Sequence, residues 1–230
     1  MLKLFFAPFV FILLFTQSSA PENKKITLAF SAILADSILR SDSPYFKHNI
    51  KDSIQIETLK FYISGIAFLK NNNISWREQI SFHLLDISVP ASMNIEINVP
   101  FEISFDELKF NLGIDSITNV SGVMGGDLDP TKGMYWTWQN GYINFKLEGK
   151  SNLCPTRKNE FQFHLGGYQF PFNALQTVNL NVKQSDKLNV VFDLKKLIAT
   201  IDLQKQNQIM SPTKEAVLLS KKVANAFRIK

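Results

Sequence analysis

Residues 133–149 read Gly-Met-Tyr-Trp-Thr-Trp-Gln-Asn-Gly-Tyr-Ile-Asn-Phe-Lys-Leu-Glu-Gly, which is the most specific pattern in the chain. This stretch holds two of the three Trp residues, Trp136 and Trp138. Asn140-Gly141 favours a two-residue hairpin turn, because both central positions of a type I′ turn need φ > 0. Closing the turn there predicts three facing pairs: Trp138 with Ile143, Trp136 with Phe145, and Met134 with Leu147. All six side chains would share one face of the hairpin, and we expect that face to lie in the core.

Short alternating segments recur on both sides of this hairpin. They cover residues 26–30, 54–69, 81–86, 95–105, 161–165, 178–182 and 188–194. Strand-length runs that are punctuated by Asn, Gly and Pro are typical of antiparallel sheets. The sequence therefore predicts an all-β fold, a β-sandwich or barrel-like single domain over residues 21–230.

The C-terminal segment changes to helical periodicity. We expect a capping helix at about residues 212–227, with Pro212 in its first turn. Lys221 and Lys222 would lie near its end, where the helix dipole favours positive charge. This helix is expected to cover the sheet and to carry no chemistry.

The first twenty residues have the pattern of an export signal. Lys3 gives one positive charge, residues 4–15 are apolar, and Ser18 and Ala20 fit the small-residue cleavage pattern. The apolar run is too short to span a bilayer, which needs about 20 residues. Residues 1–20 are therefore predicted to be a signal peptide. We expect a periplasmic or secreted protein with no transmembrane segment in the mature chain.

Composition argues against several functions. The chain is 45% apolar and carries a net charge of +5, which loses one unit with Lys3. A surplus this small, spread along the sequence, does not indicate nucleic-acid binding. Cys154 is the one cysteine, so no intramolecular disulfide can form. It is expected to be a small buried or loop residue rather than a thiolate metal ligand.

Three histidines are the candidate metal ligands: His48, His83 and His164. His164 precedes two glycines, so its imidazole either binds a metal or is satisfied by other protein groups. His83 alternates with apolar neighbours and either faces solvent or serves as a ligand. His48 lies in a polar stretch and is expected at the surface.

Other motifs favour structural interpretations. Met134 and Met124 are expected to be packing residues. Asp127 and Asp129 come after two glycines, but the spacing of a calcium loop is absent and a turn is expected. No Gly-x-Ser-x-Gly elbow and no phosphate-binding loop is present.

The chain resembles the MbnP-like copper-binding family. The resemblance lies in five segments that span nearly the whole mature chain: residues 59–66, 110–115, 128–142, 163–167 and 209–227. The Gly-Met-Tyr-Trp-x-Trp-x-x-Gly-Tyr run is highly specific. Its motif residues are Asp129, Gly133, Met134, Tyr135, Trp136, Trp138, Gly141 and Tyr142, and they are joined by His164, Gly166 and Gly167.

This resemblance implies an exported, non-enzymatic protein that sequesters or transfers copper. It implies a site built from histidine and a Trp oxidised to kynurenine by a diheme cytochrome c peroxidase-like partner. His164 and His83 would be the ligands, and Trp136 or Trp138 the oxidised residue. Copper favours imidazole ligands, and ring opening gives an arylamine and a ketone that can coordinate. A partly exposed Trp is the better target for a partner enzyme.

The chain departs from its relatives in the first mature strand. There, relatives often have a His shortly after a Phe, whereas Phe30 is followed by Ser-Ala-Ile-Leu. The alternative function is therefore a metal-free exported binding module, in which the Trp pair and the glycines are structural.

Overall fold

A computed structural model describes residues 22–35, 37–40, 46–47 and 53–230 of the chain. The predicted signal peptide, residues 1–20, and His48 lie outside these ranges. Among the described residues, no helix is long and apolar enough to cross a membrane.

Strands dominate the chain. They are β1 Asn23–Leu34, β2 Ser37–Ile38, β3 Phe46–Lys47, β4 Ser53–Lys70, β5 Asn73–Arg77, β6 Phe82–Asp86, β7 Asn94–Pro100, β8 Glu107–Leu112, β9 Tyr135–Trp136, β10 Gly141–Ser151, β11 Glu160–Gly166, β12 Gln176–Asn181, β13 Lys187–Asp193, β14 Gln208–Ile209 and β15 Phe227–Ile229. The α-helices are α1 Ser116–Val120, α2 Leu194–Ile198 and α3 Lys214–Ala224. Short 3-10 helices are η1 Pro90–Met93, η2 Gly126–Leu128 and η3 Pro130–Lys132.

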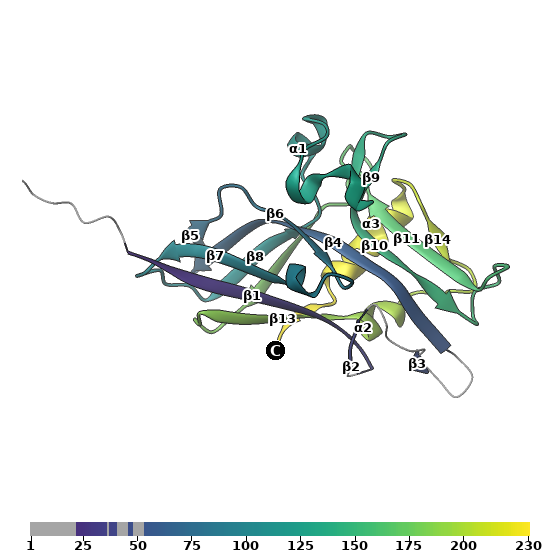
Figure 1. Ribbon diagram of the computed structural model, residues 1–230, viewed down its shortest axis with the longest axis horizontal. Coiled ribbons are helices and arrows are strands. Elements are labelled where there is room, and N and C mark those ends of the chain that lie inside the picture. Colours follow the sequence, from purple (N-terminus) through teal and green to yellow (C-terminus); the bar gives the residue numbers. More distant parts are fainter. Residues whose placement is uncertain (1–21, 36, 41–45, 48–52) are drawn as a thin grey trace, which may run out of the picture.

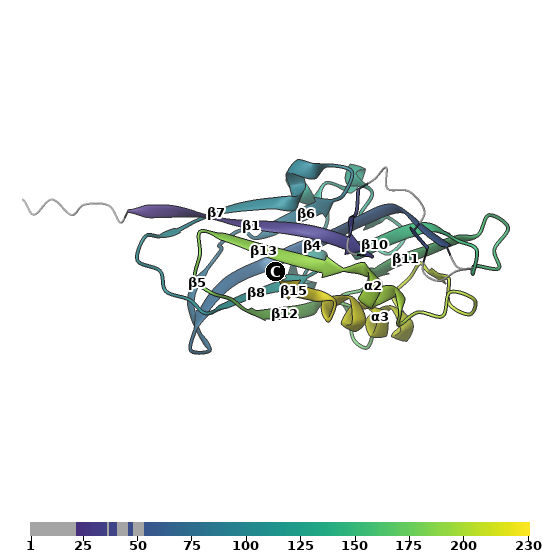
Figure 2. The same cartoon turned by 90° about the horizontal axis from the view of Figure 1, so that it is seen from below.

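The strands form two sheets that lie in layers (Figures 1 and 2). In the 5-stranded sheet, β1 pairs in parallel with β13 and antiparallel with β7 and β2. The 10-stranded sheet is built on the long strand β4 and extends through β10, β11 and β14. The β-sandwich-like prediction is confirmed, with the addition that the β1–β13 and β11–β14 pairs are parallel, so both sheets are mixed.

Two strands share one edge of β4. At Ile63, β4 pairs with β8 on one side and with β6 on the other. At Phe61, it pairs with β10 on one side and again with β6 on the other. Strands β8 and β10 therefore lie one after the other along the same edge. The segment 113–140 leaves the sheet at the junction between them.

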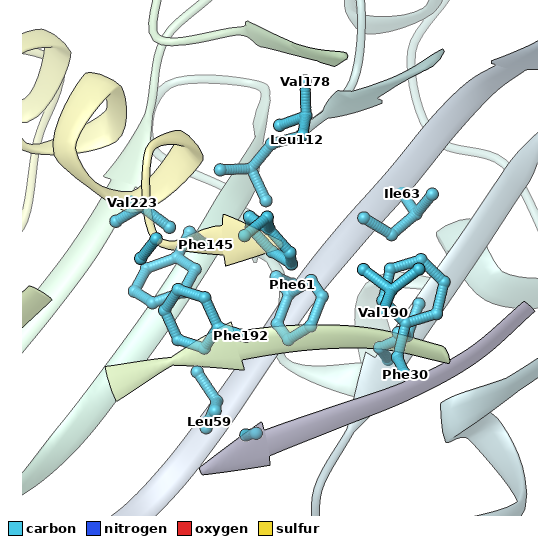
Figure 3. Close-up of a cluster of buried hydrophobic side chains, with 14 of the residues drawn as sticks. Phe30, Leu59, Phe61, Ile63, Leu112, Phe145, Val178, Val190, Phe192 and Val223 are labelled. Atoms are coloured by element: carbon cyan, nitrogen blue, oxygen red, sulfur yellow. The ribbon is translucent and has the colours of Figure 1, made fainter. Parts of the chain in front are cut away.

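The main core fills the space between the sheets (Figure 3). Phe61 of β4 contacts Phe192 of β13 at a ring-centroid distance of 6.0 Å and Phe227 of β15 at 5.7 Å. Phe30 of β1 and Phe110 of β8 meet edge-to-face at 5.8 Å. These contacts join the two sheets through aromatic side chains, which bury large apolar areas.

The C-terminal helix is shorter than predicted. The Thr213 side chain accepts a hydrogen bond from Ala216 N, so Thr213 caps α3 and Pro212 lies before the helix rather than in its first turn. After Ala224 the chain turns into β15. Phe227 is thus a strand residue that pairs with Phe192 of β13. Its ring packs against the Phe192 ring in the aromatic core between the sheets.

Cys154 is buried at the margin of this core, as the structural interpretation expects. Burial raises the pKa of its thiol, which disfavours the thiolate.

Candidate metal centre on the outer face of the large sheet

We call the face of the 10-stranded sheet that points away from the 5-stranded sheet the outer face. It carries a layer formed by residues 113–144, which includes α1 and β9 (Figure 1). Gly113 begins this layer with a φ of +111°, and a Cβ there would lie 2.3 Å from Cγ of Asn144. Only glycine fits this position. Asn144 Oδ1 then accepts a hydrogen bond from Ile114 N.

Helix α1 is fixed to the start of β10 by side-chain amides and carboxylates. Asp115 caps the helix by accepting from Thr118 N at 2.8 Å. Asn119 is buried, and its Oδ1 accepts from Tyr142 N at 2.8 Å while its Nδ2 donates to Ile114 O. The layer is therefore held in place by specific hydrogen bonds as well as by apolar contact.

Asp127 and Asp129 belong to turns of this layer, as expected. Asp127 accepts from Leu84 N of β6 at 3.0 Å and from Lys132 Nζ at 2.6 Å. Asp129 accepts from Thr131 N and from the Thr131 hydroxyl, and these hydrogen bonds lower the pKa of its carboxyl. Both carboxylates are thus occupied by loop contacts.

The layer encloses a second apolar cluster, separate from the main core. Its members are Tyr62, Leu84, Ile114, Leu128, Met134, Trp136, Tyr142 and Ile143. Tyr62 OH donates to the carbonyl oxygen of Asp127, and burial raises the pKa of the Tyr62 phenol. Met134 is fully buried here, which agrees with a packing role. Tyr135 stacks edge-to-face on Tyr142 at 5.0 Å.

The hairpin forms, but the predicted register is wrong. Trp136 lies opposite Gly141, and residues 137–140 form a longer turn in which Asn140 takes the left-handed conformation, with φ +51°. Strand β10 pairs with β4 and β11 over most of its length. A bulge between Ile143 and Phe145 reverses the alternation, so Ile143 points to the outer face and Phe145 to the inner face. This tertiary pairing overrides the local turn preference. Consequently Phe145 and Leu147 lie in the main core rather than beside the indoles.

The two indoles differ in environment. Trp136 is 6% exposed and Trp138 is 65% exposed, although their rings lie only 5.7 Å apart between centroids. Trp136 packs directly on Gly166 of β11, where a Cβ would lie 2.7 Å from its ring. Gly166 is thus the residue that lets the indole reach the sheet.

The other motif glycines shape the surrounding loops. Gly133 ends η3 in the left-handed conformation. A Cβ at Gly141 would lie 3.0 Å from the Tyr168 ring, and one at Gly167 would lie 2.3 Å from the Phe172 carbonyl oxygen. These close approaches hold the 166–173 loop against the hairpin.

His164 lies on the outer face two residues before Gly166. Its pairing partner on β10 is Lys146, and the alternating neighbours Phe163 and Leu165 point into the main core. The imidazole is 7% exposed, and its Nε2 lies 2.6 Å from Glu148 Oε1. The His164 hydrogen bond lowers the pKa of Glu148 to about 2, against the opposing effect of burial. The pair is therefore a largely buried carboxylate–histidine unit.

Two lysines connect the outer face of the sheet to the layer above it. Lys146 Nζ lies 3.8 Å from Glu148 Oε1 and donates to the carbonyl oxygen of Gly133. Lys60 Nζ forms a 2.8 Å ion pair with Asp86 and donates to the carbonyl oxygen of Lys132. The outer face thus carries a row of charged groups under the loop that leads into the Trp motif.

His83 and His164 do not form a common site. His83 lies opposite Ile63, and both residues of this pair point toward the inner side of the sheet. Its Nε2 lies 2.8 Å from Glu78 Oε2. The two imidazoles project from opposite faces, so one metal ion cannot bind both. The expectation of a two-histidine site is corrected accordingly.

The donor set in place is therefore small. Within the described ranges, no three side chains of His, Cys, Asp or Glu are grouped to hold a metal ion. His164 is the imidazole that lies beside the Trp motif. Same-face neighbours along a strand are roughly 7 Å apart, so Gly166, on which the Trp136 ring packs, lies about that far along the strand from His164.

Sequence reasoning missed Glu148 and Lys146. The signal was present in the alternation Lys146-x-Glu148 on a predicted strand, but it becomes informative only with the β10–β11 register. That register depends on the turn at residues 152–159, which carries no strong hairpin motif.

Comparison with known proteins gives the family. A protein-family model described as MbnP matches residues 23–211. Among solved structures, the fold is similar to MbnP from Methylosinus trichosporium, with 12% sequence identity, 80% of each chain covered and a TM-score of 0.61. A search of the curated proteins found no match. Because the family model covers most of the chain, this protein belongs to the MbnP family, which is associated with methanobactin and copper.

Proposed function

We propose that the chain is an exported copper-binding protein that sequesters copper or hands it on, without catalysing a reaction. The site lies on the outer face at His164 and the Trp136–Trp138 pair. The observation that carries the proposal is the contact of the Trp136 ring with Gly166, two positions along the same face from His164.

Glu148 determines which nitrogen of His164 is available. Its carboxylate engages Nε2, which leaves Nδ1 as the atom for a metal ion. A carboxylate partner orients a ligating imidazole and raises its basicity. Copper favours imidazole, so His164 is the protein's anchoring ligand.

The remaining donors come from an oxidised indole. Cleavage of the C2–C3 bond adds two oxygen atoms, and hydrolysis then releases C2 as formate, which leaves the arylamine and ketone of kynurenine. A diheme cytochrome c peroxidase-like partner is proposed to catalyse the oxidation, with two molecules of hydrogen peroxide supplying the two oxygen atoms and leaving as water. Trp138 is the indole that such a partner can reach, and Trp136 is the one that lies beside His164.

Intact mass and copper content of the protein from its native host test this proposal. We expect one indole to have exchanged a carbon for an oxygen, and copper to remain after dialysis. His164→Ala should lose the copper, whereas the matched variant His83→Ala should keep it, since His83 faces the other side of the sheet. An unmodified mass together with no retained copper would contradict the proposal.

A metal-free exported binding module is the second candidate. It is favoured by the absence of any three-donor group in the described part of the chain and by the hydrogen bond that already satisfies His164. Under this alternative, the wild-type protein from its native host would contain only background copper. His164→Ala would lower the stability of the protein and would not change its copper content.

A further inference from the structure

Exposed apolar side chains gather around Trp138. Three segments meet there: Ser116 Oγ at the start of α1 donates to the Tyr168 carbonyl oxygen, and Gln139 lines a small cavity with Phe170 and Phe172. The exposed apolar residues on these segments are Ile117, Val120, Val123, Met124, Trp138, Phe170 and Phe172. We call this set the apolar tip.

The segments that carry the tip contain no charged residue. Residues 116–126, 133–145 and 165–182 contain no Asp, Glu, Lys or Arg, in a chain whose net charge is +5. The charged residues that flank the first two segments are Asp115, Asp127, Lys132 and Lys146. The three segments of the tip themselves thus carry no charged side chain.

The tip consists of projecting side chains. Phe170 is 97% exposed and Ile117 is 82% exposed. The cavity beside them measures about 120 Å³ and is lined partly by amide side chains. A rigid protein partner would need a separate pocket for each projecting residue, whereas a lipid phase accommodates them without such pockets.

We propose that the apolar tip inserts into the interfacial region of a lipid bilayer of zwitterionic headgroups. Trp and Phe favour the membrane interface. A single charged side chain would add a large cost to insertion, and the tip has none. Because no basic cluster flanks the tip, binding needs no anionic lipid and does not weaken with salt. This inference requires neither copper nor Trp oxidation, although the tip shares Trp138 with the proposed site.

Co-sedimentation of the full mature protein with phosphatidylcholine vesicles tests the inference. We expect binding that is unchanged between low and high salt and that is not increased by phosphatidylglycerol. The double variant Ile117→Ser, Phe170→Ser should weaken the vesicle partition coefficient about tenfold or more, because both apolar side chains leave the lipid.

Ile80→Ser is the matched control, because Ile80 is also 82% exposed but lies outside the tip, on the loop between β5 and β6. It should bind vesicles like the wild type. All these positions are exposed, and thermal unfolding checks that each variant stays folded. Three results would overturn the inference: no vesicle binding, equal loss in Ile80→Ser, or binding that requires anionic lipid. Self-association of the wild type that the double variant abolishes would also overturn it, and would assign the tip to a contact between two copies.

Discussion

The two faces of β4 perform different tasks. Phe61 and Tyr62 are adjacent and both fully buried, yet Phe61 packs in the main core and Tyr62 packs under the outer layer. The inner face is joined to the other sheet by apolar and aromatic contacts. The outer face combines an apolar cluster with ion pairs, a buried imidazole and two indoles. The inner face thus holds the fold together, while the outer face carries the residues of the proposed site.

The largest effect should come from the inner face. Phe61→Ala should lower the free energy of unfolding by about 3–5 kcal/mol, because it removes a ring that contacts both sheets and leaves a cavity. Tyr62→Phe, one residue along on the outer face, should lose only about 1 kcal/mol with its hydrogen bond to Asp127. Chemical denaturation measures both. Equal losses would show that the two faces contribute to stability alike.

A smaller effect is expected where the indole meets the sheet. Gly166→Ala should cost about 1–3 kcal/mol, since the new methyl group would lie 2.7 Å from both the Trp136 ring and the Tyr142 carbonyl oxygen. Gly125→Ala is the control, because a Cβ there meets no atom within 4 Å. Thermal unfolding of the two variants should differ, and Trp fluorescence should change only for the first. An unchanged melting temperature for Gly166→Ala would mean that Trp136 does not rest on β11.

Loss of the carboxylate partner of His164 should lower the free energy of unfolding by a smaller amount still. Glu148→Gln should cost about 1–2 kcal/mol near neutral pH, as a charged hydrogen bond becomes a neutral one at a partly exposed site. Glu57→Gln, in an exposed pair with Lys150, should change stability by less than about 0.5 kcal/mol.

The pH dependence of this difference is set by the lowered pKa of Glu148. A depressed pKa adds stability that is present above the ordinary value of 4.5 and is lost as the pH falls toward the folded value of about 2. The gap in unfolding free energy between wild type and Glu148→Gln should therefore be constant above pH 4.5 and shrink below it. If the difference in unfolding free energy between the wild type and Glu148→Gln instead grew as the pH fell, the result would contradict the ionised state assigned to Glu148.

The residues of the inner face could be predicted from the sequence more readily than those of the outer face. Alternation along β1, β4 and β13 predicts buried strands, because main-core residues are specified by a local period of two. The outer layer depends on non-local facts: a glycine at 113 that admits Asn144, a bulge after Ile143, and the β10–β11 register. None of these has a local period.

The same contrast explains the outcome for the candidate ligands. His164 and Gly166 lie on β11 and Trp136 lies on β9, and only the structure shows that the Trp136 ring packs on Gly166, two residues along the strand from His164. His83 is a candidate ligand in the sequence because it stands in an alternating segment, whereas His164 also stands in the motif before two glycines. The face of His83 could be assigned only once Ile63 was known to lie opposite it. Family resemblance supplied the motif, while the pairing of strands decided which histidine accompanies it.

The smallest effect on stability should come from Trp138. Its ring is 65% exposed and contacts Trp136 at 5.7 Å, so Trp138→Phe should change the free energy of unfolding by less than about 0.5 kcal/mol. Under the proposed function, the same variant in the native host should carry less oxidised Trp136, because the buried indole would lose the exposed ring through which the proposed partner reaches it. Intact mass measures the oxidised fraction, and Trp76→Phe, in the distant strand β5, is the control. Full oxidation of Trp136 in Trp138→Phe would show that the exposed indole is dispensable. In that case the outer face would present Trp136 to its oxidant directly, and the 6% of that ring open to solvent would be sufficient.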